Sequence, residues 1–202
     1  MASKFSKRWT AGQLAALEKI LADAARKANL GPMPESDFGL TDDGKVDFRG
    51  AVLREAVRYL RVSNVDFSDL VFQEGASINE SELTDCRLDR IDMRNVFVRR
   101  RFARCSFLGA KLGGARLGGV FSDCTFEGAT LSKAFATDVR FERCIFTGAT
   151  LSGVHFISCT FDQCVFDGVK KLSGSVAGSR FIGESVQAHL SDCIVDNVRF
   201  AS

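Results

Sequence analysis

Core-forming side chains recur at every fifth position in the middle of the chain. Between residues 121 and 166 the series has no gap, and its members are Phe121, Phe126, Leu131, Ala136, Phe141, Phe146, Leu151, Phe156, Phe161 and Phe166. A small or slender side chain lies two residues before each of them, as Cys124 does before Phe126. In an extended chain, residues i−2 and i share a face, so both can point inward while their neighbours point to water.

A period of five differs from the helical period and from the ordinary strand period. Because five is odd, the chain must bend once in every unit to bring the next pair of residues inward. Four bends close a square turn of about twenty residues, and stacked turns form a parallel β-solenoid. The pattern therefore predicts an all-β fold for most of the chain.

These units give the chain a resemblance to the pentapeptide-repeat family. Residues 124–128 (CTFEG) and 149–153 (ATLSG) are representative units, and the resemblance covers roughly residues 46–200. It implies a right-handed quadrilateral parallel β-helix. The family name describes an architecture, so the resemblance by itself implies no reaction.

Residues four units apart are expected to form columns along the rod. One predicted column of rings contains Phe107, Phe126, Phe146 and Phe166, and the next contains Phe102, Phe121, Phe141, Phe161 and Phe181. All seven cysteines occupy position i−2, and five of them form one column: Cys86, Cys105, Cys124, Cys144 and Cys164. Neighbours in a column lie about 4.8 Å apart, whereas a disulfide brings Cβ atoms to about 3.8 Å, so we expect buried, reduced thiols. With only His155 and His189 to join them, both at outward positions, we expect no metal site.

The N-terminal segment has the pattern of an amphipathic helix that caps the first turn. Thr10 and Gln13 form a capping box, and the apolar face and the stop are Leu14, Leu17, Leu21, Ala28 and Gly31-Pro32. We predict a helical cap at 1–30, a linker at 31–45 and the β-helix at 46–202. A helix that serves dimerisation or secretion is the alternative.

The repeat is interrupted at a few places, where functional features concentrate. The step has six residues from Phe72 to Ile78 and four residues from Val98 to Phe102, from Leu117 to Phe121 and from Val186 to Leu190. The first short step places Arg100 at an inward position, so its side chain must swing out or find a carboxylate, unless Phe97 points inward instead. Lys170-Lys171 interrupts the core pattern, and we predict an outward loop at about 168–175.

The charge of the chain is balanced, with 27 Lys and Arg against 25 Asp and Glu. The resemblance implies one alternative function, because quinolone-resistance-type members protect DNA gyrase as acidic mimics of DNA. A mimic needs a continuous anionic surface, and here seven arginines lie within residues 87–104: Arg87, Arg90, Arg94, Arg99, Arg100, Arg101 and Arg104. We interpret this cluster as a solvated surface of mixed charge, with phosphate or nucleic-acid binding as the alternative.

The sequence favours a non-catalytic scaffold that binds a macromolecular partner. Regular polar ladders on a convex rod do not converge on a pocket as catalysis requires, so we expect no catalytic residues and no cofactor. No apolar run reaches the roughly 18 residues of a membrane span, and we expect a cytoplasmic protein that does not bind nucleic acid directly. The partner is a protein of unknown identity. A topoisomerase partner and a homodimer formed through a rod end, which the resemblance implies, are the alternatives.

One outward stripe is the candidate partner-binding surface. In the frame with Val98 inward, Phe97, Arg116, Phe135 and His155 hold the same position in four consecutive turns, with Arg99 and Ile157 in the row beside them. An arginine between two rings is typical of cation–π stacking, which would only stabilise the fold. Exposed aromatic rings beside arginine are also typical of protein-binding hot spots.

Overall fold

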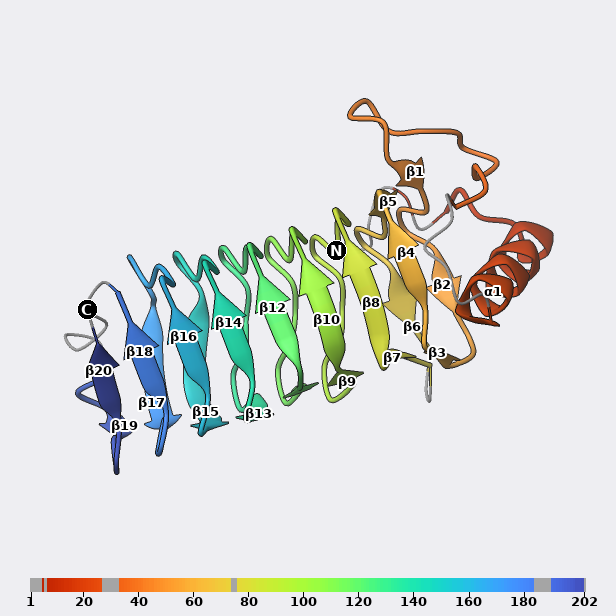
Figure 1. The fold of residues 1–202 in the computed structure, drawn as a ribbon. Coiled ribbons are helices and arrows are strands. Elements are labelled where there is room, and N and C mark those ends of the chain that lie inside the picture. Colours follow the sequence, from red (N-terminus) through yellow and green to blue (C-terminus); the bar gives the residue numbers. More distant parts are fainter. Residues whose placement is uncertain (1–4, 6, 27–32, 74–75, 184–189, 202) are drawn as a thin grey trace.

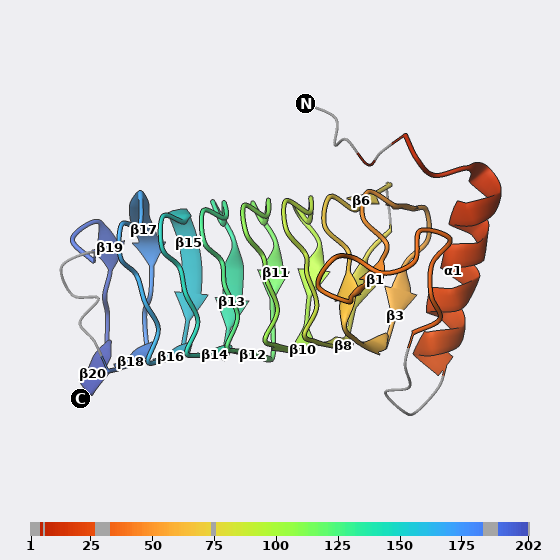
Figure 2. The same ribbon diagram turned by 90° about the horizontal axis from the view of Figure 1, so that it is seen from above.

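The computed structural model describes residues 5, 7–26, 33–73, 76–183 and 190–201. These residues form a rod of stacked turns, and one helix, α1 (Ala11–Arg26), lies at the N-terminal end of the rod (Figure 1). Figure 2 shows α1 lying across this end, with the last strands at the opposite end. All strands within the sheets pair in parallel, which confirms the predicted β-solenoid with a helical cap.

Two long sheets form two faces of the rod. The eight-stranded face consists of β4 (Arg61–Ser63), β8 (Ser81–Thr84), β10 (Arg100–Ala103), β12 (Val120–Ser122), β14 (Arg140–Glu142), β16 (Thr160–Asp162), β18 (Arg180–Ile182) and β20 (Arg199–Ala201). The six-stranded face consists of β9 (Phe97–Val98), β11 (Arg116–Leu117), β13 (Phe135–Thr137), β15 (Thr150–Ile157), β17 (Lys171–Ser175) and β19 (Cys193–Ile194).

Three two-stranded sheets complete the first turns. They pair β1 (Val46–Asp47) with β5 (Val65–Asp66), β2 (Val52–Leu53) with β6 (Val71–Phe72), and β3 (Val57–Arg58) with β7 (Ile78–Asn79). Single parallel bridges, such as Thr125 to Ile145 and Thr130 to Thr150, continue the first two pairs along the rod. The rod thus has four faces. Its corners are made by left-handed residues such as Gly128 (φ 63°) and Asp123 (φ 54°).

Stacked phenylalanine rings fill the interior. The ring centroids of Phe102 and Phe121 lie 5.0 Å apart, and those of Phe107 and Phe126 lie 4.9 Å apart. The two columns meet edge to face, with 5.7 Å between Phe121 and Phe126. Both predicted ladders are confirmed. Val98 is buried, which confirms the frame in which Phe97 points outward.

The cysteines form the predicted buried column. Cys86, Cys105, Cys124, Cys144 and Cys164 are buried and free, as is Cys159 on another face, whereas Cys193 is free and half-buried. Each column thiol lies near a backbone carbonyl, for example 3.4 Å from Cys124 Sγ to the Ser122 oxygen. Burial raises the pKa of the Cys159 thiol to about 12.

Thiol labelling is expected to separate these two classes of cysteine. Because the thiolate is the reactive form and burial disfavours it, a water-soluble maleimide should modify Cys193 in the native protein and the six buried thiols only after denaturation. Mass spectrometry with and without denaturant counts the adducts. Rapid native labelling of several thiols would show that the column is accessible to solvent.

Helix α1 closes the N-terminal end of the rod. The capping box is confirmed, since the Thr10 backbone N–H donates to Gln13 Oε1 at 2.8 Å and the Gln13 N–H donates to Thr10 Oγ1 at 3.3 Å. Leu17 and Leu21 are buried, and the helix contacts β2, β3 and β4. The predicted positions Ala28 and Gly31-Pro32 lie outside the described residues, as does Val186 at the last short step. The division at residues 30 and 45 stays a prediction.

The predicted outward loop at 168–175 is wrong. Residues 171–175 form strand β17, which pairs with β15, and Leu172 is buried. The extra residue is absorbed by a shift of register between Leu151 and Val154 of β15. Leu172 fills the core in place of Lys171, so the chain does not need to leave the rod.

Candidate partner-binding surface

The outward stripe lies on the six-stranded face. Parallel pairing places Phe97 opposite Arg116, Arg116 opposite Phe135, and Phe135 opposite His155. Ile157 pairs with Thr137 in the adjacent outward row. The structure therefore brings the four predicted row residues together in one line along the rod. We call Phe97, Arg99, Arg116, Phe135, His155 and Ile157 the stripe.

The Arg116 guanidinium lies between two rings of the stripe. The Arg116 guanidinium carbon lies 5.3 Å from the Phe97 centroid and 6.0 Å from the Phe135 centroid. On the other side of Phe135, the His155 ring stacks at 5.0 Å with an interplanar angle of 8°. Both faces of the Phe135 ring are therefore occupied within the stripe. The rings remain accessible at their edges, since Phe97 is 38% exposed and Phe135 is 43% exposed.

The Arg99 side chain lies beside Phe97 because Gly118, its neighbour in the next turn, has no side chain. Its guanidinium carbon lies 4.6 Å from the Phe97 centroid. A Cβ atom on Gly118 would lie 2.9 Å from the Arg99 Cγ atom, closer than side chains approach. Gly118 thus leaves the space in which Arg99 lies flat on this face.

The short step after Val98 turns Arg100 away from the core. Arg100 has a φ of 101°, and its guanidinium pairs with Glu82 at 2.6 Å. In the next turn Gly119 makes a close approach, because a Cβ atom there would lie 2.1 Å from the Arg100 carbonyl oxygen. The prediction that the Arg100 side chain turns outward to a carboxylate is therefore confirmed.

The arginine cluster forms ion pairs along the rod. Arg90 pairs with Asp69, Arg94 with Asp92, Arg104 with Asp85 and Arg87 with Asp43, each at 2.7 Å. Arg99 reaches Glu80 only at 4.0 Å. Within the described part of the chain, Arg101 has no ion pair. The paired carboxylates therefore neutralise most of the positive charge of the arginine cluster.

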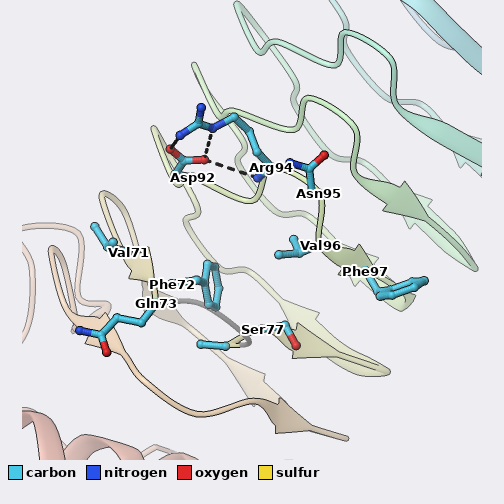
Figure 3. Close-up of a pocket in the computed structure, with 10 residues that line it drawn as sticks. Val71, Phe72, Gln73, Ser77, Asp92, Arg94, Asn95, Val96 and Phe97 are labelled. Carbon is cyan, nitrogen blue, oxygen red and sulfur yellow. Dashed lines mark hydrogen bonds and ion pairs between the residues drawn. The ribbon is translucent and has the colours of Figure 1, made fainter.

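A pocket of about 690 Å³ adjoins the stripe at Phe97. Figure 3 shows Phe72 and Val96 on neighbouring turns with the pocket between them, and Phe97 at one edge. Gln73, Asn95 and the Asp92–Arg94 ion pair lie at its polar side. Strand β7 belongs to a different sheet from β9, so the six-stranded face begins at this place.

Sequence reasoning placed the stripe but missed the pocket. The available signal was the six-residue step from Phe72 to Ile78, which spaces one turn differently from the next. The described residues contain no group of three His, Cys, Asp or Glu side chains placed to hold a metal ion. Nor does the described part of the chain contain a helix long and apolar enough to cross a membrane.

Comparisons with known proteins concern the repeats and the fold. Two models of pentapeptide repeats match residues 102–145 and residues 137–170. No curated protein matches the sequence. Among solved structures, trypsin-treated QnrB1, a plasmid-mediated fluoroquinolone resistance protein, has 18% identity and a TM-score of 0.40, with 76% of this chain and 77% of that chain covered.

Two further solved structures are similar to a comparable extent. Full-length QnrB1 has 17% identity and a TM-score of 0.37, with 76% of this chain and 79% of that chain covered. HetL, a pentapeptide repeat protein involved in heterocyst differentiation regulation from the cyanobacterium Nostoc, has 14% identity and a TM-score of 0.29, with 77% and 75% covered. The two matching models show that residues 102–170 of this chain consist of pentapeptide repeats.

Proposed function

We propose that the chain is a non-catalytic scaffold that binds a protein partner through the stripe. The observation that carries this proposal is the row of exposed rings around an arginine without an ion pair. Arg116 lies between Phe97 and Phe135, and no carboxylate among the described residues pairs with it. Aromatic residues and arginine are the residue types enriched at protein interfaces, where they dominate the binding energy.

The shape of the face supports binding of a partner rather than catalysis. Parallel strands hold successive stripe side chains about 4.8 Å apart on a regular surface. A partner that covers this surface removes apolar ring area from water while few side-chain torsions are frozen. Ordered side chains lose little conformational entropy on binding, so the stripe is preorganised for a partner.

The charge of this face favours a scaffold over a DNA mimic. In the two outward rows between residues 77 and 177, the charged residues are Arg99 and Arg116, and neither row contains a carboxylate. A mimic of DNA would need a continuous row of negative charge, so it would have to use another face. We place the scaffold in the cytoplasm, where free thiols such as those of the cysteine column stay reduced.

The double substitution Phe135→Ser and Arg116→Glu is expected to abolish partner binding. It removes a central ring and reverses the only charge between the two rings, while surface changes of this kind usually alter stability by no more than about 1–2 kcal/mol. Affinity capture from extracts of cells that express the protein, followed by mass spectrometry, measures the loss of bound protein.

The matched control changes similar residues on other faces. Ile145 is 41% exposed and Arg140 lies on the eight-stranded face, so Ile145→Ser with Arg140→Glu alters the same chemistry away from the stripe. The control should keep the partner. If the stripe variant also keeps it, the binding surface lies elsewhere. Protection of DNA gyrase in a supercoiling assay by both variants would support the mimic instead.

A further inference from the structure

The pocket beside Phe97 has apolar walls that a large apolar side chain of a partner can contact. Its volume of about 690 Å³ lies within the range of ligand pockets, about 300–1,000 Å³. Phe72 and Val96 form apolar walls, and Val71 at the rim is 43% exposed. An apolar side chain placed there would remove these surfaces from water.

The surface around the pocket carries positive charge. Asp92 is the acidic residue among the described residues that line the pocket; Arg94 donates two hydrogen bonds of 2.7 Å to it, and Lys111 lies 3.9 Å away. Arg116 has no ion pair among the described residues, and Arg99 only a long one. A partner with carboxylates would therefore complement this face.

The orientation of the rings also favours carboxylates and disfavours stacked bases. Arg99 and Arg116 lie over the ring of Phe97, and Arg116 and His155 lie over that of Phe135. Nucleic-acid bases bind aromatic platforms through the ring faces, and here both faces of Phe135 are covered and two guanidinium groups lie against Phe97. The exposed ring edges carry the positive part of the quadrupole, so they attract negative groups.

We infer that the partner presents an acidic segment with one large apolar side chain, which enters the pocket while its carboxylates contact Arg99 and Arg116. This inference rests on the proposed scaffold function and names the chemistry of the partner. Successive rows of the face are about 4.8 Å apart, so a few extended residues span the pocket and both arginines. The pocket provides the anchor, and the arginines select for charge.

Selection of peptides from a random library tests this chemistry directly. The full-length protein is immobilised, and a display library of short random peptides is selected against it. The enriched peptides should combine Glu or Asp with an aromatic or large aliphatic residue a few positions away. A synthetic copy of an enriched peptide then serves as the probe in fluorescence anisotropy.

Two variants separate the anchor from the charge. Ser77 lines the pocket, so Ser77→Phe places a ring at the pocket without changing charge, and Arg116→Glu reverses the charge without narrowing the pocket. Each variant should lower the affinity for the peptide by about tenfold or more, as loss of a hot spot does. The Arg140→Glu control should leave the affinity unchanged. Thermal melting of each variant confirms that it is folded.

Several outcomes would overturn the inference. Enriched peptides that are neutral or basic, no enrichment at all, or affinity that survives both variants would each contradict it. Tighter binding of single-stranded oligothymidylate, lost in Arg116→Glu, would assign the face to nucleic acid. If cellular capture still depends on Phe135 and Arg116 after such a result, the scaffold function stands and only the acidic segment is wrong.

Discussion

Replacing Phe146 by Ala is expected to lower the free energy of unfolding by about 3–5 kcal/mol. Phe146 is fully buried, and its ring stacks between Phe126 at 5.0 Å and Phe166 at 5.1 Å. Phe141 and Phe161 meet it edge to face at 5.5 and 6.3 Å. The substitution therefore removes contacts in three directions at once.

The size of this effect follows from the architecture. The backbone on either side of Phe146 is fixed by parallel pairing with the turns above and below, for example between Phe146 N–H and the Val165 oxygen at 2.7 Å. Neighbouring rings cannot move into the space without breaking their own stacks, so the cavity stays open and costs the full transfer and cavity energy.

Urea unfolding followed by circular dichroism measures the loss. The matched control is Phe135→Ala, which truncates an exposed ring of the same type. It should lower the free energy of unfolding by less than about 1 kcal/mol. A Phe146→Ala variant as stable as that control would show that the turns close around the cavity.

The interior and the stripe were predictable because both follow from counting. An inward or outward position in this fold depends on the place of a residue in its five-residue unit, and the partner in the next turn lies four units away. Phe121 over Phe102 and Phe135 over Arg116 are two results of the same rule. No long-range information beyond the repeat was needed for either.

The breaks in the repeat that fall within the described residues were located correctly, but their structural outcome was not always predictable. An extra residue near Lys170 can be accommodated by an outward loop or by a shift of strand register. The local sequence is compatible with both, so it does not distinguish them. The second outcome occurs because Leu172 is available to fill the core one position later. The pocket between Phe72 and Val96 depends in the same way on how two unlike turns stack.

The repeat pattern did not predict a group of contacts around Asp47 near the N-terminus, which we call the clamp. Asp47, whose side chain is 3% exposed, accepts hydrogen bonds from Arg8 Nη1 at 2.9 Å and from Arg49 Nη2 at 2.7 Å. The Arg8 guanidinium carbon lies 3.9 Å from the Phe38 centroid, and Trp9 Nε1 donates to the Arg49 oxygen at 2.9 Å. The contacts from Arg8 to Asp47 and from Trp9 to Arg49 join segments about forty residues apart that have no periodic relation, so sequence spacing gives no signal for them.

The clamp makes Asp47→Asn the second substitution with a large expected effect, a loss of about 2–4 kcal/mol at neutral pH. The amide cannot replace the charge-assisted bonds, although both arginines are partly exposed and can be hydrated, which keeps the loss below that of a fully buried pair. Desolvation raises the pKa of Asp47, but the hydrogen bonds from Arg8 and Arg49 outweigh it and hold the pKa well below 3.8.

The pH dependence of that loss identifies its cause. A carboxyl whose pKa is depressed by folding stabilises the protein at every pH above its unfolded value, about 3.8, and this stabilisation is lost as the pH falls toward the folded value. The difference in unfolding free energy between the native protein and Asp47→Asn should therefore be constant from pH 7 to about pH 5 and shrink below about pH 4. Urea unfolding of both proteins over this range measures it, and the other acidic groups cancel because both proteins carry them. A difference that stays constant down to pH 3 would mean that the clamp acts through packing around Arg8 and Trp9 and not through the charge of Asp47.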